Sequence, residues 1–414
     1  MDALFPPGPR KNLLLGNSIE FRHDPFTAML DAARSYGEIV HFRFGPSHAY
    51  LVTSADHIHY VLVERPDLFD TQHHFYRAIQ SAFGHELFAP DEGVYKRQRT
   101  SQPLPQNWFE EHTATVVNDA LEAVAGWQSG QVIDLYQTLR ELTLQIAAKT
   151  VFGCEVNNAI RQLAVNAPQS HALRDRRFTS PWALRLPVGD QTLATVIKLI
   201  RQQTSIKGNH ALALLGQTSL SEQQIAETLI RLFVLVHETA ATTLSWALYL
   251  LSRHPESAET LHCELNTVSE DAELTYTEMV LRETMRLYPP AWLVTRQSRR
   301  EARLGSFFVP AGSTILCSPY IMHHDPRNFV EPEKFMPERF IEGYEKRIRR
   351  YAFAPFGVSA PVEQATLMTE MKLLLTTLAR RFHFVHEGNH PEVLPQVSLC
   401  PKNGLPMRVE KIAT

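Results

Sequence analysis

Cysteine is scarce in this chain of 414 residues. The four cysteines, Cys154, Cys263, Cys317 and Cys400, lie far apart, and no two have C-x-x-C spacing. A disulfide framework or a zinc site is therefore not expected, and we predict a reduced, cytoplasmic protein without a metal centre. The sequence also lacks a signal-peptide pattern and any apolar run near the ~20 residues of a membrane span, so we expect no membrane partner.

An excess of charge of one sign is absent as well. The formal net charge is −3, which gives no indication of a nucleic-acid partner. We find no internal repeat, low-complexity segment or Gly/Ser-rich linker that would divide the chain. With 44% hydrophobic residues the chain can build a large core, and we expect a single domain over residues 1–414.

Helical periodicity dominates what is present. The longest periodic segment, 223–253, is apolar on nearly every side and is expected to run through the interior. Two short β-like runs, 38–44 and 49–54, flank a Gly-Pro turn and predict a hairpin. The expected fold class is therefore mainly α with small β-sheets. The other segments with apolar residues at helical spacing are 107–127, 137–152, 190–208, 274–288 and 362–382.

Three motifs carry a family resemblance. LRETMRLYPP contains an E-x-x-R pair, Glu283 and Arg286, on one helix face. EPEKFMPERF contains a P-E-R-F element with Arg339, and HETAATTLSWALYLLSRHPE lies in the long central helix. With these motifs the chain resembles the cytochrome P-450 (haem-thiolate monooxygenase) superfamily over nearly its whole length. The resemblance implies a cytochrome P-450-like fold, an α-helical bundle with a long central helix, in which Glu283, Arg286 and Arg339 form a structural triad.

The resemblance also implies a cysteine that the sequence does not supply. The family holds haem iron through a thiolate in a loop of the form F-x-x-G-x-x-x-C-x-G. Here the matching stretch, FAPFGVSAPVEQATLMTEMK at 353–372, contains no cysteine and is about two residues shorter. The nearby Ser359 and Glu363 are poor substitutes for a thiolate. This is the first of three reasons why we expect that haem is absent and that the protein has no cofactor.

The central helix departs from the family pattern as well. Where the family has A-G-x-[D/E]-T against the haem, this chain has LVHET. Leu235 and Val236 replace the small pair and are expected to fill the oxygen site. Glu238 and Thr239 are retained as candidate catalytic residues. Glu238 is either a general acid or base whose pKa is raised by burial, or a carboxylate paired with an arginine or a water, and both interpretations remain open.

The basic residues that would hold haem propionates are partly retained. The family's W-x-x-x-R run corresponds here to Tyr95 and Arg99, and Arg296 in LVTRQS matches another usual partner. Arginine binds carboxylates strongly, but these need not belong to haem. Tyr95, Arg99 and Arg296, together with Leu235 and Val236, are therefore the candidate ligand-binding residues.

Three functional hypotheses follow. We favour a haem-free cytochrome P-450-like enzyme that catalyses a non-oxidative step (cyclisation, aldol-type or elimination) on a small molecule in bacterial secondary-metabolite biosynthesis. The first alternative is a non-catalytic auxiliary partner of another biosynthetic enzyme such as a glycosyltransferase, as haem-less proteins resembling this family are in macrolide pathways. The second is a haem-binding monooxygenase with an unusual axial ligand. Fold alone does not decide among them.

Overall fold

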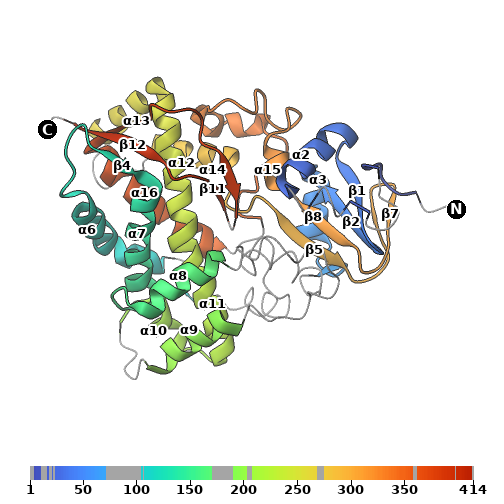
Figure 1. Ribbon diagram of the computed structural model, residues 1–414, viewed down its shortest axis with the longest axis horizontal. Helices are drawn as coiled ribbons and strands as arrows, with labels where there is room; N and C mark the ends of the chain where they lie inside the picture. Colours follow the sequence, from blue (N-terminus) through green and yellow to red (C-terminus); the bar gives the residue numbers. More distant parts are fainter. Residues whose placement is uncertain are drawn as a thin grey trace.

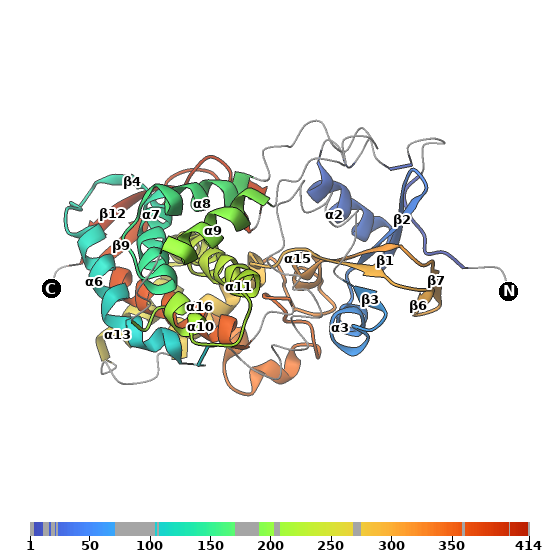
Figure 2. The ribbon, with the colours of Figure 1, turned by 90° about the horizontal axis from the view of Figure 1, so that it is seen from below.

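The computed structural model describes residues 4–10, 16–17, 21, 24–70, 104–105, 107–169, 190–202, 208–267, 275–357, 361–396 and 398–412. Helices gather in the part of the molecule that holds the C-terminus, and a mixed sheet lies in the part that holds the N-terminus (Figure 1). The view from below shows the same division (Figure 2). The prediction of a mainly α fold with small β-sheets is confirmed.

The helical part is built mainly from elements between Trp108 and Ala379. Its α-helices are α6 (Thr113–Val124), α7 (Leu135–Ala147), α8 (Asn158–Gln169), α9 (Asp190–Gln202), α10 (Ala211–Gly216), α11 (Glu222–Val234), α12 (Ala240–Arg253), α13 (Pro255–Thr267), α14 (Thr275–Leu287) and α16 (Pro361–Ala379). Shorter 3₁₀ or π elements are η2 (Trp108–His112), η3 (Ala148–Phe152), η4 (Leu235–Thr239), η5 (Pro337–Phe340) and η6 (Tyr344–Arg347).

The long central helix runs through α11, η4 and α12. It begins at Ser221, whose hydroxyl accepts a hydrogen bond from the backbone N–H of Gln224, while the Gln224 side chain accepts one from the Ser221 N–H. Such a capping box satisfies donors that a helix start leaves open. Every residue from Ala240 to Leu251 is buried. The helix therefore lies in the interior, as its apolar composition predicts.

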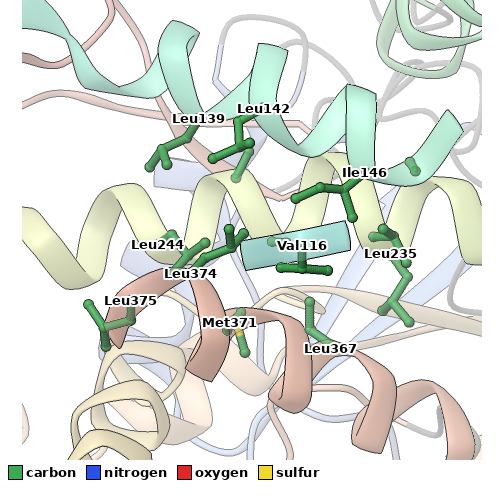
Figure 3. Close-up of a cluster of buried hydrophobic side chains, with 14 of the residues drawn as sticks. Val116, Leu139, Leu142, Ile146, Leu235, Leu244, Leu367, Met371, Leu374 and Leu375 are labelled. Atoms are coloured by element: carbon green, nitrogen blue, oxygen red, sulfur yellow. The ribbon is translucent and has the colours of Figure 1, made fainter. Parts of the chain in front are cut away.

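The largest hydrophobic cluster lies where the central helix meets α6, α7 and α16 (Figure 3). Fully burying one aliphatic side chain of this kind contributes about 1.5–3 kcal/mol, so the cluster is a main source of stability. It also fixes α7 and α16 against η4, which places their side chains around the candidate site. The side chains labelled in Figure 3 are Val116, Leu139, Leu142, Ile146, Leu235, Leu244, Leu367, Met371, Leu374 and Leu375.

A five-stranded sheet forms the other part of the molecule, in the order β1-β2-β8-β5-β3. The predicted hairpin is present as β1 (Ile39–Phe44) and β2 (Ser47–Val52), which pair antiparallel. β2 pairs parallel with β8 (Thr314–Cys317), and β8 pairs antiparallel with β5 (Val294–Ser298). The early hairpin and the later strands therefore share one sheet.

The remaining elements are short. The strands are β3 (Phe69–Asp70), β4 (Val132–Asp134), β6 (Ala302–Leu304), β7 (Phe307–Val309), β9 (Phe382–Val385), β10 (Val393–Pro395), β11 (Leu399–Pro401) and β12 (Pro406–Lys411), and the helices are α2 (Pro25–Tyr36), α3 (Ala55–His59), η1 (Tyr60–Glu64) and α15 (Pro319–His323). β12 pairs with both β4 and β9. No helix in the described ranges is long and apolar enough to cross a membrane.

Candidate functional site

The central helix changes its winding at η4, which is π-helical. π-turns inside α-helices are rare and occur often at functional sites. All five residues of η4 are buried, and the hydroxyl Oγ1 of Thr239 has no hydrogen-bond partner. The helix periodicity in the sequence predicted a continuous α-helix here and gave no sign of the π-turn.

The two bulky residues of η4 are both inside the protein. Leu235 packs in the cluster of Figure 3, where Val116 of α6 and Leu367 of α16 also lie. Val236 is fully buried. Both side chains therefore add apolar volume around the π-turn, and their predicted effect on an oxygen site remains a prediction.

Glu238 of η4 is held by two side chains from α7. Tyr136 donates its hydroxyl to Glu238 Oε1 at 2.9 Å, and the Nε of Arg140 lies 3.2 Å from Oε2. Burial, followed by the charge of Glu238, raises the pKa of Tyr136 well above its usual value, so the phenol keeps its proton. Two interpretations of Glu238 were left open, and the structure agrees with the second, in which the carboxylate is paired with an arginine.

His237 lies on the same turn and is also buried. Its Nδ1 is 3.1 Å from the hydroxyl of Thr143, and its Nε2 has no partner. Burial and the nearby charge of Arg140 lower the pKa of His237 to about 3, so the imidazole is neutral at physiological pH. A neutral, enclosed imidazole of this kind contributes packing and a hydrogen bond rather than charge.

The structure brings Glu283, Arg286 and Arg339 together in a dry site. Arg286 Nε and Nη2 lie 2.8 and 2.9 Å from the two carboxylate oxygens of Glu283. Arg339 Nε lies 3.2 Å from Glu283 Oε1, which also accepts the N–H of Met336 at 3.0 Å. All three side chains are at most 2% exposed. The triad thus fixes the segment after α15 to α14 and takes a structural role.

His323 connects this triad to the loop that precedes α16, a link that the sequence did not reveal. Its Nδ1 lies 3.0 Å from the carbonyl oxygen of Arg286, and its Nε2 accepts the N–H of Ala354 at 3.1 Å. Gly357 ends the described part of the loop with φ 59°, and a Cβ there would lie 2.9 Å from a methyl group of Val294. The loop is therefore held tightly between α14, α15 and the start of β5.

Arg296 lies on β5, close to this loop, and its guanidinium is buried. Its Nη1 donates to the carbonyl oxygen of Thr295 at 2.8 Å. The other two candidate anion-binding residues, Tyr95 and Arg99, lie outside the described residues. Their grouping with Arg296 in one ligand site therefore remains a prediction.

The cysteines are not arranged as metal ligands. Cys317 and Cys400 are buried, and burial raises the pKa of each thiol to about 12. Cys154 is half-buried and Cys263 is exposed. Across the described ranges no three His, Cys, Asp or Glu side chains form a group that could hold a metal ion.

The chain matches the family described as Cytochrome P450 over residues 6–169 and 189–406. It is similar to the cyclooctat-9-en-7-ol 5-monooxygenase of Streptomyces melanosporofaciens, with 29% identity covering 89% of this chain and 87% of the relative. The cyclooctatin synthase of the same organism is 28% identical, with coverage of 93% and 91%. The pentalenene oxygenase of Streptomyces avermitilis is 26% identical, with coverage of 90% of each chain.

These matches contradict the prediction that haem is absent. Haem is the group that members of the matched family normally bind, and two of the three relatives are named as a monooxygenase and an oxygenase. The error has a physical origin. The prediction rested on three departures from the family pattern: the missing cysteine, the bulky Leu235 and Val236, and the partly retained propionate partners. It took them together as the loss of the cofactor, whereas apolar contacts and the remaining arginines can still hold a porphyrin.

Proposed function

Since the chain belongs to the cytochrome P450 family, we propose that it is a haem-binding monooxygenase of small, largely apolar molecules whose iron is not held by a cysteine thiolate. Haem would supply the oxygen and one-electron chemistry that amino-acid side chains lack. Of the three hypotheses from the sequence, this one agrees with both the family and the absence of cysteine from residues 353–372.

The unpartnered hydroxyl of Thr239 is the observation that carries the proposal. It is fully buried on the π-turn, yet Oγ1 makes no hydrogen bond. An unsatisfied buried hydroxyl costs about 1–3 kcal/mol, so folded proteins usually give such a group a partner. A ligand oxygen or a bound water beside the π-turn would provide that partner. Thr239 therefore fits a residue that donates a hydrogen bond to a bound group.

Arg296 is a second residue that supports the proposal. A buried guanidinium on a strand of the sheet keeps a fixed positive charge, and carboxylates bind to such charges through strong hydrogen bonds. The contact of Gly357 with Val294 holds the loop against the beginning of the same strand. Residues present in the structure thus fit the carboxylate edge of a porphyrin.

The donors present do not fit a thiolate-bound iron. The sequence has no cysteine between Cys317 and Cys400. Cys317 lies in β8 within the sheet, and the Cys400 thiol donates to the carbonyl oxygen of Leu394 at 3.4 Å. With pKa values near 12, both groups remain thiols at neutral pH, and a thiol is a poor metal ligand. We therefore assign no reaction step to a thiolate and propose a nitrogen or oxygen ligand.

Glu238 takes a positioning role in this proposal. Both of its carboxylate oxygens are already engaged by Tyr136 and Arg140, so it is not a free base. The pair fixes the π-turn to α7 and thereby sets where the Thr239 hydroxyl lies. The Thr239 hydroxyl would then be the group of η4 that donates a hydrogen bond to a bound ligand.

The substrate class rests on the relatives. Their names refer to oxygenation or formation of cyclooctat-9-en-7-ol, cyclooctatin and pentalenene. The first of these names is that of a ring alcohol with one double bond, a compound with little polarity. We propose a substrate of this kind, a small cyclic compound with few polar groups, bound mainly by apolar contact.

Haem reconstitution tests the proposal. The full chain, expressed without haem and titrated with hemin, is expected to bind one haem per chain. Arg296→Leu is expected to weaken binding about tenfold or more, because a hydrogen bond to a charged group contributes about 1.5–3 kcal/mol. Arg300→Leu is the matched control, since that arginine is 67% exposed and pairs only with the surface residue Asp67 among the described residues.

Two results would count against the proposal. One is a wild-type chain that binds no hemin although it is folded by circular dichroism. The other is equal hemin affinity in the Arg296→Leu and Arg300→Leu variants, which would remove Arg296 from the site.

A further inference from the structure

Two imidazoles from distant parts of the chain face each other away from the π-turn. His262 lies on α13, and His383 lies on β9, which follows α16. Their ring centroids are 4.3 Å apart and the ring planes meet at 66°. α13 and the strands beside it lie together at the end of the molecule that holds the C-terminus (Figure 1).

The pair opens onto a small hollow between α12, α13 and β9. The hollow has a volume of about 40 Å³, which is larger than the ~10–15 Å³ that a water molecule or a small ion requires. His262, His383 and Ser252 supply its polar lining, and the other lining residues are apolar. One ring nitrogen from each histidine and bound water can therefore meet in this partly open hollow.

The rings of these two histidines also make no hydrogen bond to another described residue. In the part of the chain that the structure describes, every other histidine makes at least one ring hydrogen bond. His254, for example, lies 2.8 Å from the carbonyl oxygen of Leu250, and His386 contacts two carbonyl oxygens. His262 and His383 have no such bond, and their contact is with each other.

We propose that His262 and His383 are ligands of one divalent transition-metal ion of the Zn²⁺, Ni²⁺ or Cu²⁺ class, with water completing the coordination. Neutral imidazole is a preferred ligand for these ions. A tetrahedral ion about 2.0–2.1 Å from one nitrogen of each ring would need the rings to separate by about 1 Å. The exposed His383 has room to move in this way.

The charge state of His262 agrees with metal binding. Burial, together with the neighbouring His383, lowers the pKa of His262, so its ring is neutral at physiological pH and has a lone pair to offer. Binding would join α13 to β9, two elements whose Leu261 and Phe382 line the same hollow. The ion would therefore act as a clamp between these elements, separate from the π-turn.

A zinc titration tests this site. The full chain is treated with chelator, exchanged into metal-free buffer and titrated with ZnCl₂ by calorimetry near neutral pH. We expect one equivalent of Zn²⁺ to bind. His262→Ala and His383→Ala are each expected to lower the affinity at least tenfold. His59→Ala is the matched control, because that ring is already bonded to Glu64, and it should bind as the wild type does.

A second measurement uses only the wild-type protein, so its result does not depend on whether the alanine variants fold. Cu²⁺ added to the wild type should give an electron paramagnetic resonance spectrum with coupling to two imidazole nitrogens. Absence of Zn²⁺ binding, or the same affinity in wild type and both alanine variants, would overturn the proposal. Because no haem enters these experiments, their failure would leave the proposed function untouched.

Discussion

Substitution of Glu370 tests how a buried carboxyl group affects the stability of the helical core. The residue lies on α16, is fully buried, and neither carboxylate oxygen has a hydrogen-bond partner. Burial alone raises its pKa well above the usual value, so the folded protein holds this carboxyl in its neutral form. The perturbation we choose is Glu370→Gln, which keeps the shape and removes the titration.

The magnitude follows from proton linkage. Above a pH of about 4.5 the unfolded chain loses the proton of Glu370 while the folded chain keeps it, so the wild type loses stability as pH rises. The loss is about 1.4 kcal/mol per pH unit until the folded carboxyl itself ionises. The Glu370→Gln variant has no ionisable group at this position and does not undergo this loss of stability. Its stability relative to wild type should therefore increase by about 3 kcal/mol over two pH units above 5.

Urea unfolding of both proteins at several pH values measures this difference. Glu342→Gln serves as the control, because that side chain is exposed and its substitution should leave the pH dependence unchanged. The reasoning is refuted if the difference between Glu370→Gln and wild type is flat between pH 5 and 7, or if the variant is the less stable protein at neutral pH.

Three further substitutions test other buried groups. Arg339→Leu leaves Glu283 partly uncompensated in a dry site and should cost about 3–5 kcal/mol in urea unfolding; a loss below 1 kcal/mol would show that the triad is solvated. Tyr136→Phe removes one donor from Glu238 and should cost about 1–3 kcal/mol; an unchanged unfolding midpoint would contradict this. The depressed pKa of His237 should reduce stability as pH falls from about 6.5 towards 3, because the unfolded chain then gains a proton. His237→Asn should lessen that acid sensitivity, and an identical pH profile would exclude His237 as its source.

Features with a strong local signal could be predicted from the sequence. The E-x-x-R and P-E-R-F motifs place Glu283, Arg286 and Arg339, and the structure has all three in contact. The Gly-Pro turn between two alternating runs predicts the β1–β2 hairpin, with strand ends shifted by one or two residues. The long apolar segment predicts a buried central helix, because a helix without a polar face must be covered on all sides.

Features that depend on tertiary contacts could not be predicted from the sequence. The π-turn at η4 leaves no mark in the hydrophobic period, since it changes the winding of one turn only. The partners of Glu238 lie on α7, about a hundred residues earlier in the chain, so no local pattern identifies Tyr136 and Arg140. The same holds for His323, whose two ring nitrogens join the triad to the loop. The expectation that haem is absent was wrong because three local departures from the family pattern were taken to outweigh the match over nearly the whole chain.

The carbon-monoxide difference spectrum of the reduced, haem-loaded protein tests the central claim most directly, because the position of its Soret band depends on the atom bound to iron opposite carbon monoxide. We predict a haem complex with the shorter-wavelength band of a nitrogen or oxygen ligand. A band at the long wavelength that marks a thiolate ligand, or a folded chain that takes up no haem at all, would contradict the account.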